Sequence, residues 1–164
     1  MKKIFHLLTS LILVICIFSC TGYEPIFSSS NLEFKIADYS IAGEKKLGNR
    51  IYSKLYNLSK SSINNSNAKD IYILINASKN KSATAKNSAG KILGYKINLS
   101  TTVVIKDLKS GTQLLNENFN FSSSYKTQDL YSETKNLENT TIDNLIDKTY
   151  ESLLIKLSES ILKQ

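Results

Sequence analysis

The sequence predicts an α+β fold: a two-layer sandwich in which a four-stranded, mostly antiparallel sheet carries two helices on one face, in the order βαβββα. Three observations carry this prediction. The stretch from Gly94 to Tyr125 alternates apolar and polar residues on either side of a turn, which is typical of a β-hairpin. Segments that begin near Glu44 and Asp129 repeat apolar residues at helical spacing. The chain of 164 residues is long enough for one domain with its own core.

The first strand is expected from Leu32 to about Ile41. Leu32, Phe34 and Ile36 alternate with charged or small residues, so one face of the strand is apolar. The alternation changes phase near Tyr39, which predicts a bulge or the end of the strand.

An amphipathic helix of four turns is expected from Glu44. Its apolar stripe consists of Leu47, Ile51, Leu55 and Leu58. Gly48 lowers the helix propensity by about 1 kcal/mol relative to alanine, and a close approach of the helix to the sheet would explain the glycine. A polar loop from Ser61 to Lys69 follows.

The second strand is expected from Asp70 to Ala77. It is apolar on both faces, which predicts a central strand covered on both sides. A strand, a helix and a strand in succession favour a right-handed crossover. The stretch from Lys79 to Gly90 is interpreted as a long polar connection into the hairpin.

The hairpin supplies the last two strands. Its turn is expected at Asp107 to Gly111, a stretch of turn-forming composition. Such a hairpin is marginally stable alone, so its apolar face needs further strands and a covering layer. The cover is expected from a long helix over about Asp129 to Lys163, with a break near Asn139 or Thr140. Its stripe consists of Leu137, Ile142, Leu145, Ile146, Leu153, Leu154, Leu157 and Ile161.

The N-terminus has the features of a lipoprotein signal peptide, expected at residues 1–19. Lys2 and Lys3 precede an apolar run that is shorter than a membrane span of about 20 residues. The run ends in Ile-Phe-Ser-Cys, which resembles a bacterial lipobox with Cys20 as the lipidated residue. Residues 20–31 are then a lipidated N-terminus and tether, and 32–164 a single domain. An ordinary signal peptide followed by a free or disulfide-bonded Cys20 is the alternative.

Cleavage before Cys20 excludes several classes of chemistry. The only histidine, His6, and the only other cysteine, Cys16, would leave with the signal peptide. The mature chain would lack the usual zinc ligands and the His and Cys groups of acid–base and nucleophilic catalysis. No Gly-rich phosphate loop, nucleophile elbow or paired-carboxylate motif occurs. The sequence therefore predicts a protein that is not an enzyme and that holds neither metal nor cofactor.

Charge is unevenly placed along the chain. The formal net charge is +7, and no acidic residue lies between Asp70 and Asp107. From Asp129 onward, acids outnumber lysines, so the two halves of the fold carry opposite charge. Nucleic acid is not the partner expected for an exported, membrane-tethered protein, and the abundant polyanions in that compartment are the phosphates of lipopolysaccharide. We hypothesise contacts to them from Lys79, Lys81, Lys86, Lys91 and Lys96.

Lys91 and Lys96 are the strongest candidates among these, because each lies beside a flexible glycine, Gly90 or Gly94. The alternative is that the lysines only keep a Lys- and Asn-rich protein soluble and protect a sheet edge from aggregation.

The mature N-terminus also resembles that of a known family, LptE, the lipopolysaccharide-assembly lipoproteins of Gram-negative bacteria. Many members begin with Cys-Gly-aromatic-x-Pro-aliphatic-aromatic, and Thr21, inserted before the glycine, departs from this pattern. The element order and the long C-terminal helix are similar too. The matching residues are Cys20, Gly22, Tyr23, Pro25, Ile26 and Phe27.

The resemblance implies a protein anchored in the inner leaflet of the outer membrane, on the periplasmic side. It would plug the large β-barrel LptD and assist the insertion of lipopolysaccharide into the outer leaflet. Only Cys20 carries over by position. Two alternatives stay open, an activator of a periplasmic cell-wall enzyme and a solute-trafficking lipoprotein. The short tether, at most roughly 35 Å long, favours a partner in the same membrane.

Overall fold

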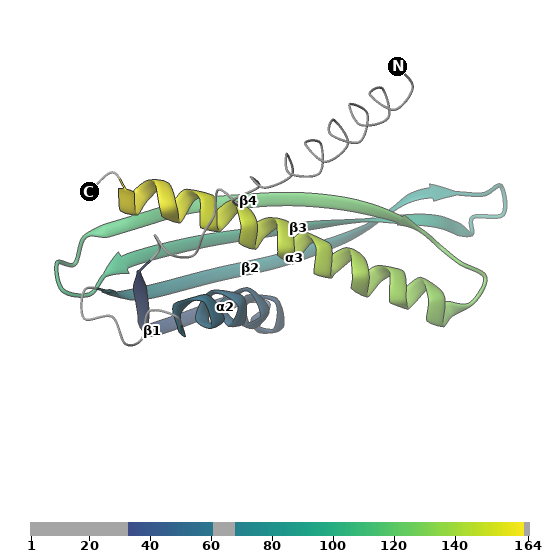
Figure 1. The fold of residues 1–164 in the computed structure, drawn as a ribbon. Helices are drawn as coiled ribbons and strands as arrows, with labels where there is room; N and C mark the ends of the chain where they lie inside the picture. The colour runs from purple at the N-terminus through teal and green to yellow at the C-terminus, as the bar shows by residue number, and fades with distance from the viewer. Residues whose placement is uncertain (1–32, 61–67, 163–164) are drawn as a thin grey trace, which may run out of the picture.

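The computed structural model describes residues 33–60 and 68–162. The predicted signal peptide at 1–19, the lipidation site Cys20 and the tether at 20–31 lie outside these ranges. The elements follow the predicted order (Figure 1). They are β1 (Phe34–Gly43), α2 (Lys45–Ser59), β2 (Lys69–Lys86), β3 (Ile92–Asp107), β4 (Gln113–Lys126) and α3 (Tyr131–Leu162).

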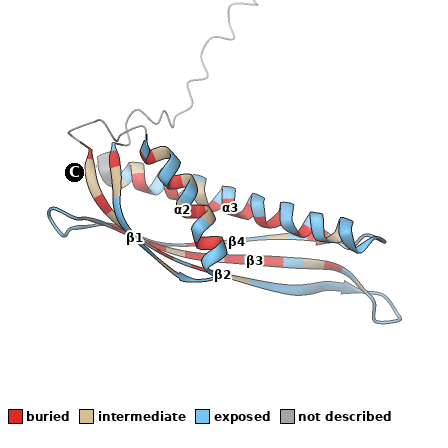
Figure 2. Cartoon of the chain, turned by 90° about the horizontal axis from the view of Figure 1, so that it is seen from below, coloured by how far each residue is buried: buried red, intermediate tan, exposed pale blue. Residues whose placement is uncertain are grey.

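The four strands form one open sheet in the order β1-β2-β3-β4. β1 pairs with β2 in parallel, and the other two pairs are antiparallel. Both helices lie on one face of this sheet (Figure 2). Gly48 of α2 lies close to Ile75 of β2, and Glu138 of α3 accepts a hydrogen bond from Lys81 of β2. Because Ile75 and Lys81 are an even number of residues apart in one strand, their side chains point to the same face of the sheet. The predicted two-layer α+β architecture is therefore confirmed.

The core lies between this face of the sheet and the two helices. Ile146 and Leu153 of α3 are fully buried, as are Ile51 and Leu55 of α2. The odd-numbered residues of β3 from Ile97 to Ile105 are all buried and point to the helices. Side chains from α3 and the sheet dominate this core, as the apolar stripe of the helix predicts. None of the helices in the described ranges is both long and apolar enough to span a membrane.

The opposite face of the sheet, here called the open face, has no covering element among the described residues. The prediction that β2 is covered on both sides is wrong, because Tyr72 and Leu74 are only half-buried there. Most other positions on this face are small and polar. They include Asn76, Ser78, Asn80, Ser82, Asn98, Ser100, Thr102, Asn116, Asn118, Asn120, Ser122 and Ser124.

Three local features test the sequence interpretation further. The predicted irregularity of β1 is present, as a register shift between Ile36 and Asp38. Gly48 is explained by close packing, since a Cβ there would lie 2.5 Å from Ile41 Cγ2. The predicted break at Asn139 or Thr140 is wrong, because α3 is continuous.

The extent of β2 also differs from the prediction. The interpretation of Lys79 to Gly90 as a loop is wrong, because β2 continues to Lys86. Its distal half pairs with β3 up to Lys86 opposite Ile92. The hydrogen-bond ladder with β3 holds these residues extended although their side chains are almost all exposed.

Candidate functional site

The five candidate lysines all come from β2, β3 and the turn that joins them. This turn lies beside the start of α3, at the end of the molecule opposite the first residues of β1, and we call this region the distal end (Figure 1). Asn87 orders the turn, because its side-chain oxygen accepts hydrogen bonds from the amides of Ala89 and Lys91 at 3.1 and 2.8 Å. Gly90 supplies the left-handed backbone that the turn requires, with φ at 81°.

Lys79 and Lys81 point to the helix face and are paired with acids there. The Lys81 ammonium lies 2.8 Å from Glu138 Oε2 and 4.0 Å from the ring centre of Tyr95. Lys79 lies near Glu44, with Nζ and Oε2 separated by 4.0 Å. These contacts favour structural roles for both lysines over contact with an external anion.

Glu138 is the centre of this charged cluster. Its side chain is only 10% exposed, and Lys135 Nζ lies 3.3 Å from its second oxygen. Burial raises the pKa of Glu138, but the hydrogen bonds from Lys81 and Lys135 outweigh burial and hold the pKa below its usual value. Burial of Lys81 lowers its pKa, but the hydrogen bond to Glu138 acts in the opposite direction. Together with its other interactions, this bond leaves the pKa of Lys81 above its usual value. The cluster therefore fixes the distal half of β2 to α3.

Replacing Glu138 with Gln is expected to lower the free energy of unfolding by about 1–2 kcal/mol at neutral pH. A carboxyl with a lowered folded-state pKa stabilises the fold above its unfolded-state pKa. This contribution is lost as the pH falls through the folded-state value. The difference between parent and variant, measured by urea unfolding, should therefore shrink on acidification.

Glu133→Gln is the matched control, because Glu133 is exposed on the same helix. It should change the free energy of unfolding by less than about 0.5 kcal/mol. A Glu138→Gln variant with the stability of the parent at every pH would contradict the proposed role of the cluster.

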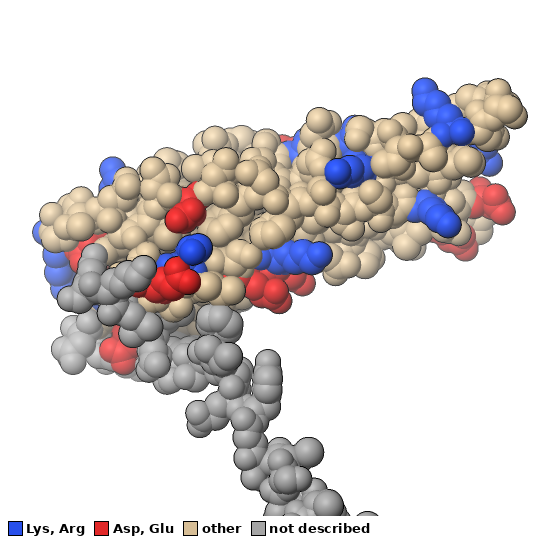
Figure 3. All heavy atoms as spheres, turned by 90° about the horizontal axis from the view of Figure 1, so that it is seen from above, with Lys and Arg blue, Asp and Glu red and all other residues tan. Residues whose placement is uncertain are grey.

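Lys86, Lys91 and Lys96 are placed differently. All three are exposed, and within the described ranges none of them forms an ion pair. Lys96 points to the open face, since it alternates with the buried residue Ile97. Several lysines occupy the end toward which the hairpin projects, on the right in Figure 3, and acidic side chains lie along the lower side of this view, including its right end.

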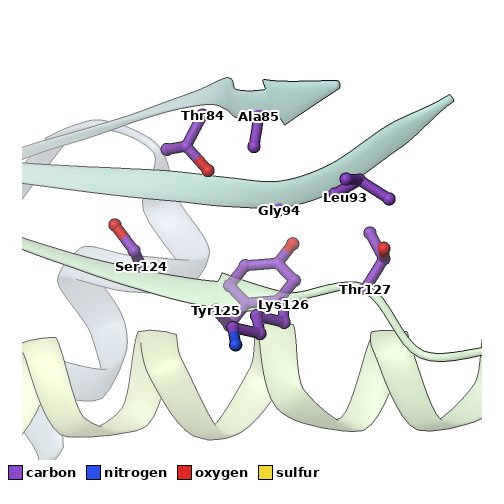
Figure 4. Close-up of a pocket in the computed structure, with 8 residues that line it drawn as sticks. All are labelled: Thr84, Ala85, Leu93, Gly94, Ser124, Tyr125, Lys126 and Thr127. Atoms are coloured by element: carbon purple, nitrogen blue, oxygen red, sulfur yellow. The ribbon is translucent and has the colours of Figure 1, made fainter. Parts of the chain in front are cut away.

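A hollow of about 690 Å³ lies between the ends of β2, β3 and β4, and it is lined by residues that neighbour Lys86 and Lys96 in their strands. The labelled side chains surround Gly94 (Figure 4). Because glycine has no side chain, the hollow between them stays unfilled. A Cβ at Gly94 would lie 2.9 Å from Thr84 Oγ1, so a larger residue would enter the hollow. We call it the Gly94 hollow, and it is lined by Thr84, Ala85, Leu93, Gly94, Ser124, Tyr125, Lys126 and Thr127.

Lys126 and Glu138 were missed by sequence reasoning. Lys126 pairs with Gly94 across the β3–β4 ladder and points to the open face. Extending the strand alternation by one residue past Tyr125 would have placed it. Glu138 falls on the apolar stripe of α3, one turn before Ile142, and a carboxylate at such a position indicates a buried partner.

Comparison with known proteins places the fold among those of bacterial lipoproteins. The solution structure of an uncharacterized lipoprotein B from Nitrosomonas europaea is similar with a TM-score of 0.55 and 14% identity, covering 81% of this chain and 88% of that one. A minor lipoprotein from Acinetobacter baumannii is similar with a TM-score of 0.52 and 16% identity, covering 78% and 93%. No protein-family model and no curated protein matches the chain.

Proposed function

We propose that this protein is an outer-membrane lipoprotein that plugs the LptD β-barrel and assists the insertion of lipopolysaccharide, by contact and not by catalysis. Cys20 would carry the lipid anchor. The proposal combines the N-terminal resemblance to the LptE family with a fold that is similar to those of other lipoproteins. The single observation that carries it is the uncovered open face of the sheet.

The open face suits the lumen of a large barrel. Barrel lumens are wet and lined with polar groups, so a plug must present hydrogen-bonding side chains over a wide area. Asn, Ser and Thr occupy most positions on this face. Its described positions in β3 from Lys96 to Val104, and in β4 from Asn116 to Lys126, include no acidic residue. Lys96 and Lys126 lie on this same face at its distal end, where lipopolysaccharide phosphates would be met.

The length of the sheet supports a role across the membrane. β2 has 18 residues, which at about 3.3 Å each gives roughly 60 Å. A bilayer including its headgroups is about 40–45 Å thick. Phe34 pairs with Lys69, so the first described strand starts at the end away from the distal turn. A body anchored at that end could therefore extend the distal end toward the opposite leaflet.

Co-purification tests this function directly. The full chain is extracted from outer membranes in mild detergent, and the proteins that remain bound are identified by mass spectrometry. We expect LptD in an equimolar, salt-resistant complex. The same preparation from a Cys20→Ala strain controls for anchoring and should yield less complex. Recovery of a periplasmic cell-wall enzyme without LptD would overturn the proposal in favour of the activator alternative.

Charge reversal at Lys91 and Lys96 is expected to weaken binding of purified lipopolysaccharide about tenfold, which corresponds to about 1.4 kcal/mol. Both ammonium groups are exposed and lie near the distal turn, so reversal adds repulsion to phosphate. Binding of the full-length protein to immobilised lipopolysaccharide measures the effect.

The matched control is charge reversal at Lys45 and Lys46, which are exposed at the start of α2 and change the net charge equally. Its binding should stay within about twofold of the parent. If both variants lost the same binding affinity, net charge would explain the effect. If the Lys91/Lys96 variant bound lipopolysaccharide as tightly as the parent, these two lysines would not belong to the binding site.

A further inference from the structure

We infer that the Gly94 hollow holds an acyl chain of an anionic amphiphile, with Lys96 and Lys126 beside it to bind the charged headgroup. The inference rests on the proposed function, which supplies an amphiphilic ligand, and deepens it by assigning the apolar part of that ligand to a place in the fold. Neither the lysine pattern nor the resemblance predicts such a place.

The chemistry of the lining supports an apolar occupant. Ala85 and Leu93 contribute only hydrocarbon, and the Leu93 side chain remains 43% exposed although it is a large aliphatic group. An exposed leucine next to an unfilled hollow can be covered favourably by a hydrocarbon chain. The volume of about 690 Å³ falls within the range of about 300–1,000 Å³ that is typical of ligand sites.

The position of the hollow within the open face supports the same occupant. A second hollow, of about 320 Å³, lies farther along this face and is lined mostly by Asn and Ser side chains such as Asn98 and Asn120. That one suits water or a polar group. The apolar Gly94 hollow is therefore a local departure from the polar character of the face, and it lies at the lysine-rich end.

Charge complementarity defines the headgroup. Lys126 lines the hollow and pairs directly with Gly94, and Lys96 is the next residue of β3 on the same face. A residue two positions along a strand lies about 7 Å away. Neither ammonium has an ion-pair partner among the described residues. Two cations beside an apolar hollow match a phosphate joined to a hydrocarbon chain.

Photo-crosslinking tests this assignment. The probe is dodecyl phosphate with a diazirine at the end of its alkyl chain, added to the full chain in phosphatidylcholine nanodiscs. Peptide mass spectrometry then locates the adducts. We expect them on the peptides that contain Ala85, Leu93 and Thr127. The corresponding alcohol, which has no phosphate, should label the same peptides more weakly.

Ala85→Phe fills the hollow from an exposed position and is expected to lower the labelling about tenfold. Leu93→Gln, which removes an apolar wall without adding bulk, should lower it in the same direction. Lys126→Gln should reduce labelling by the phosphate probe and leave labelling by the alcohol unchanged. The matched control Asn98→Phe adds the same ring at the polar hollow and should label like the parent.

Adducts spread evenly over the open face, or unchanged in Ala85→Phe, would overturn the inference. Co-purification with LptD is measured in parallel, so the two proposals fail separately. Site-specific labelling without LptD would support the hollow and leave the barrel role unsupported. An LptD complex with no specific labelling would overturn the hollow alone.

Discussion

Replacing Ile146 with Asp is expected to abolish the cooperative unfolding of this domain. Ile146 lies at the centre of the buried face of α3, with no exposed surface. A carboxylate there would lose its hydration without gaining a cation, and such substitutions cost about 4–5 kcal/mol or more. Single domains are stable by only about 5–15 kcal/mol in total. Thermal unfolding followed by circular dichroism should therefore show no sigmoidal transition.

Asn144→Asp provides the control for Ile146→Asp. It adds the same charge to the same helix, but Asn144 is exposed. Its free energy of unfolding should stay within about 0.5 kcal/mol of the parent value. If Ile146→Asp kept a transition near that of the parent, α3 would not be docked on the sheet in solution.

The hairpin and both helices were predictable because their side-chain patterns reflect burial directly. In β3, the apolar residues Ile97, Leu99, Val103 and Ile105 are all buried on the helix side, and the residues that alternate with them are polar apart from Val104. The same holds for most of the predicted stripe of α3, where Ile146 and Leu153 are fully buried, but Leu137 at its start is exposed. Periodicity predicts an element well when packing of side chains holds that element in place.

The distal half of β2 was unpredictable for the converse reason. From Lys79 to Lys86 nearly every side chain is exposed, so no alternation of apolar residues arises. Backbone hydrogen bonds to β3 hold this half of the strand, and they leave no pattern in side-chain chemistry. An unpatterned polar stretch next to a long hairpin strand therefore predicts a loop and a strand equally well.

The candidate site was predictable only in its charge. The acid-free stretch indicates a basic surface, and Lys86, Lys91 and Lys96 are indeed exposed at the distal end. The pairing of Lys81 with Glu138 could not be predicted, because 57 positions separate them and the long-range fold brings them together. The Gly94 hollow forms where the ends of β2, β3 and β4 meet, so it depends on how these strands are aligned. Amino-acid composition does not determine this alignment.

Replacing Gly43 with Ala is expected to destabilise the fold by about 3–5 kcal/mol. Gly43 ends β1 with a φ of 70°, a region that costs an L-residue about 1–2 kcal/mol. A Cβ there would also lie 2.2 Å from the backbone oxygen of Ala77. That oxygen accepts a 2.7 Å hydrogen bond from the Glu44 amide, so it cannot move without breaking the link between β2 and the start of α2.

Gly111→Ala separates the two contributions to this loss. Gly111 has almost the same φ, 69°, but nothing lies within 4 Å of the position of an added Cβ. This control should therefore cost only the backbone strain of about 1–2 kcal/mol. Urea unfolding of both variants measures the difference, which isolates the contact between β1 and β2 at the junction with α2. Equal losses at the two glycines would mean that this junction relaxes freely, and the close parallel pairing of β1 with β2 would then not hold in solution.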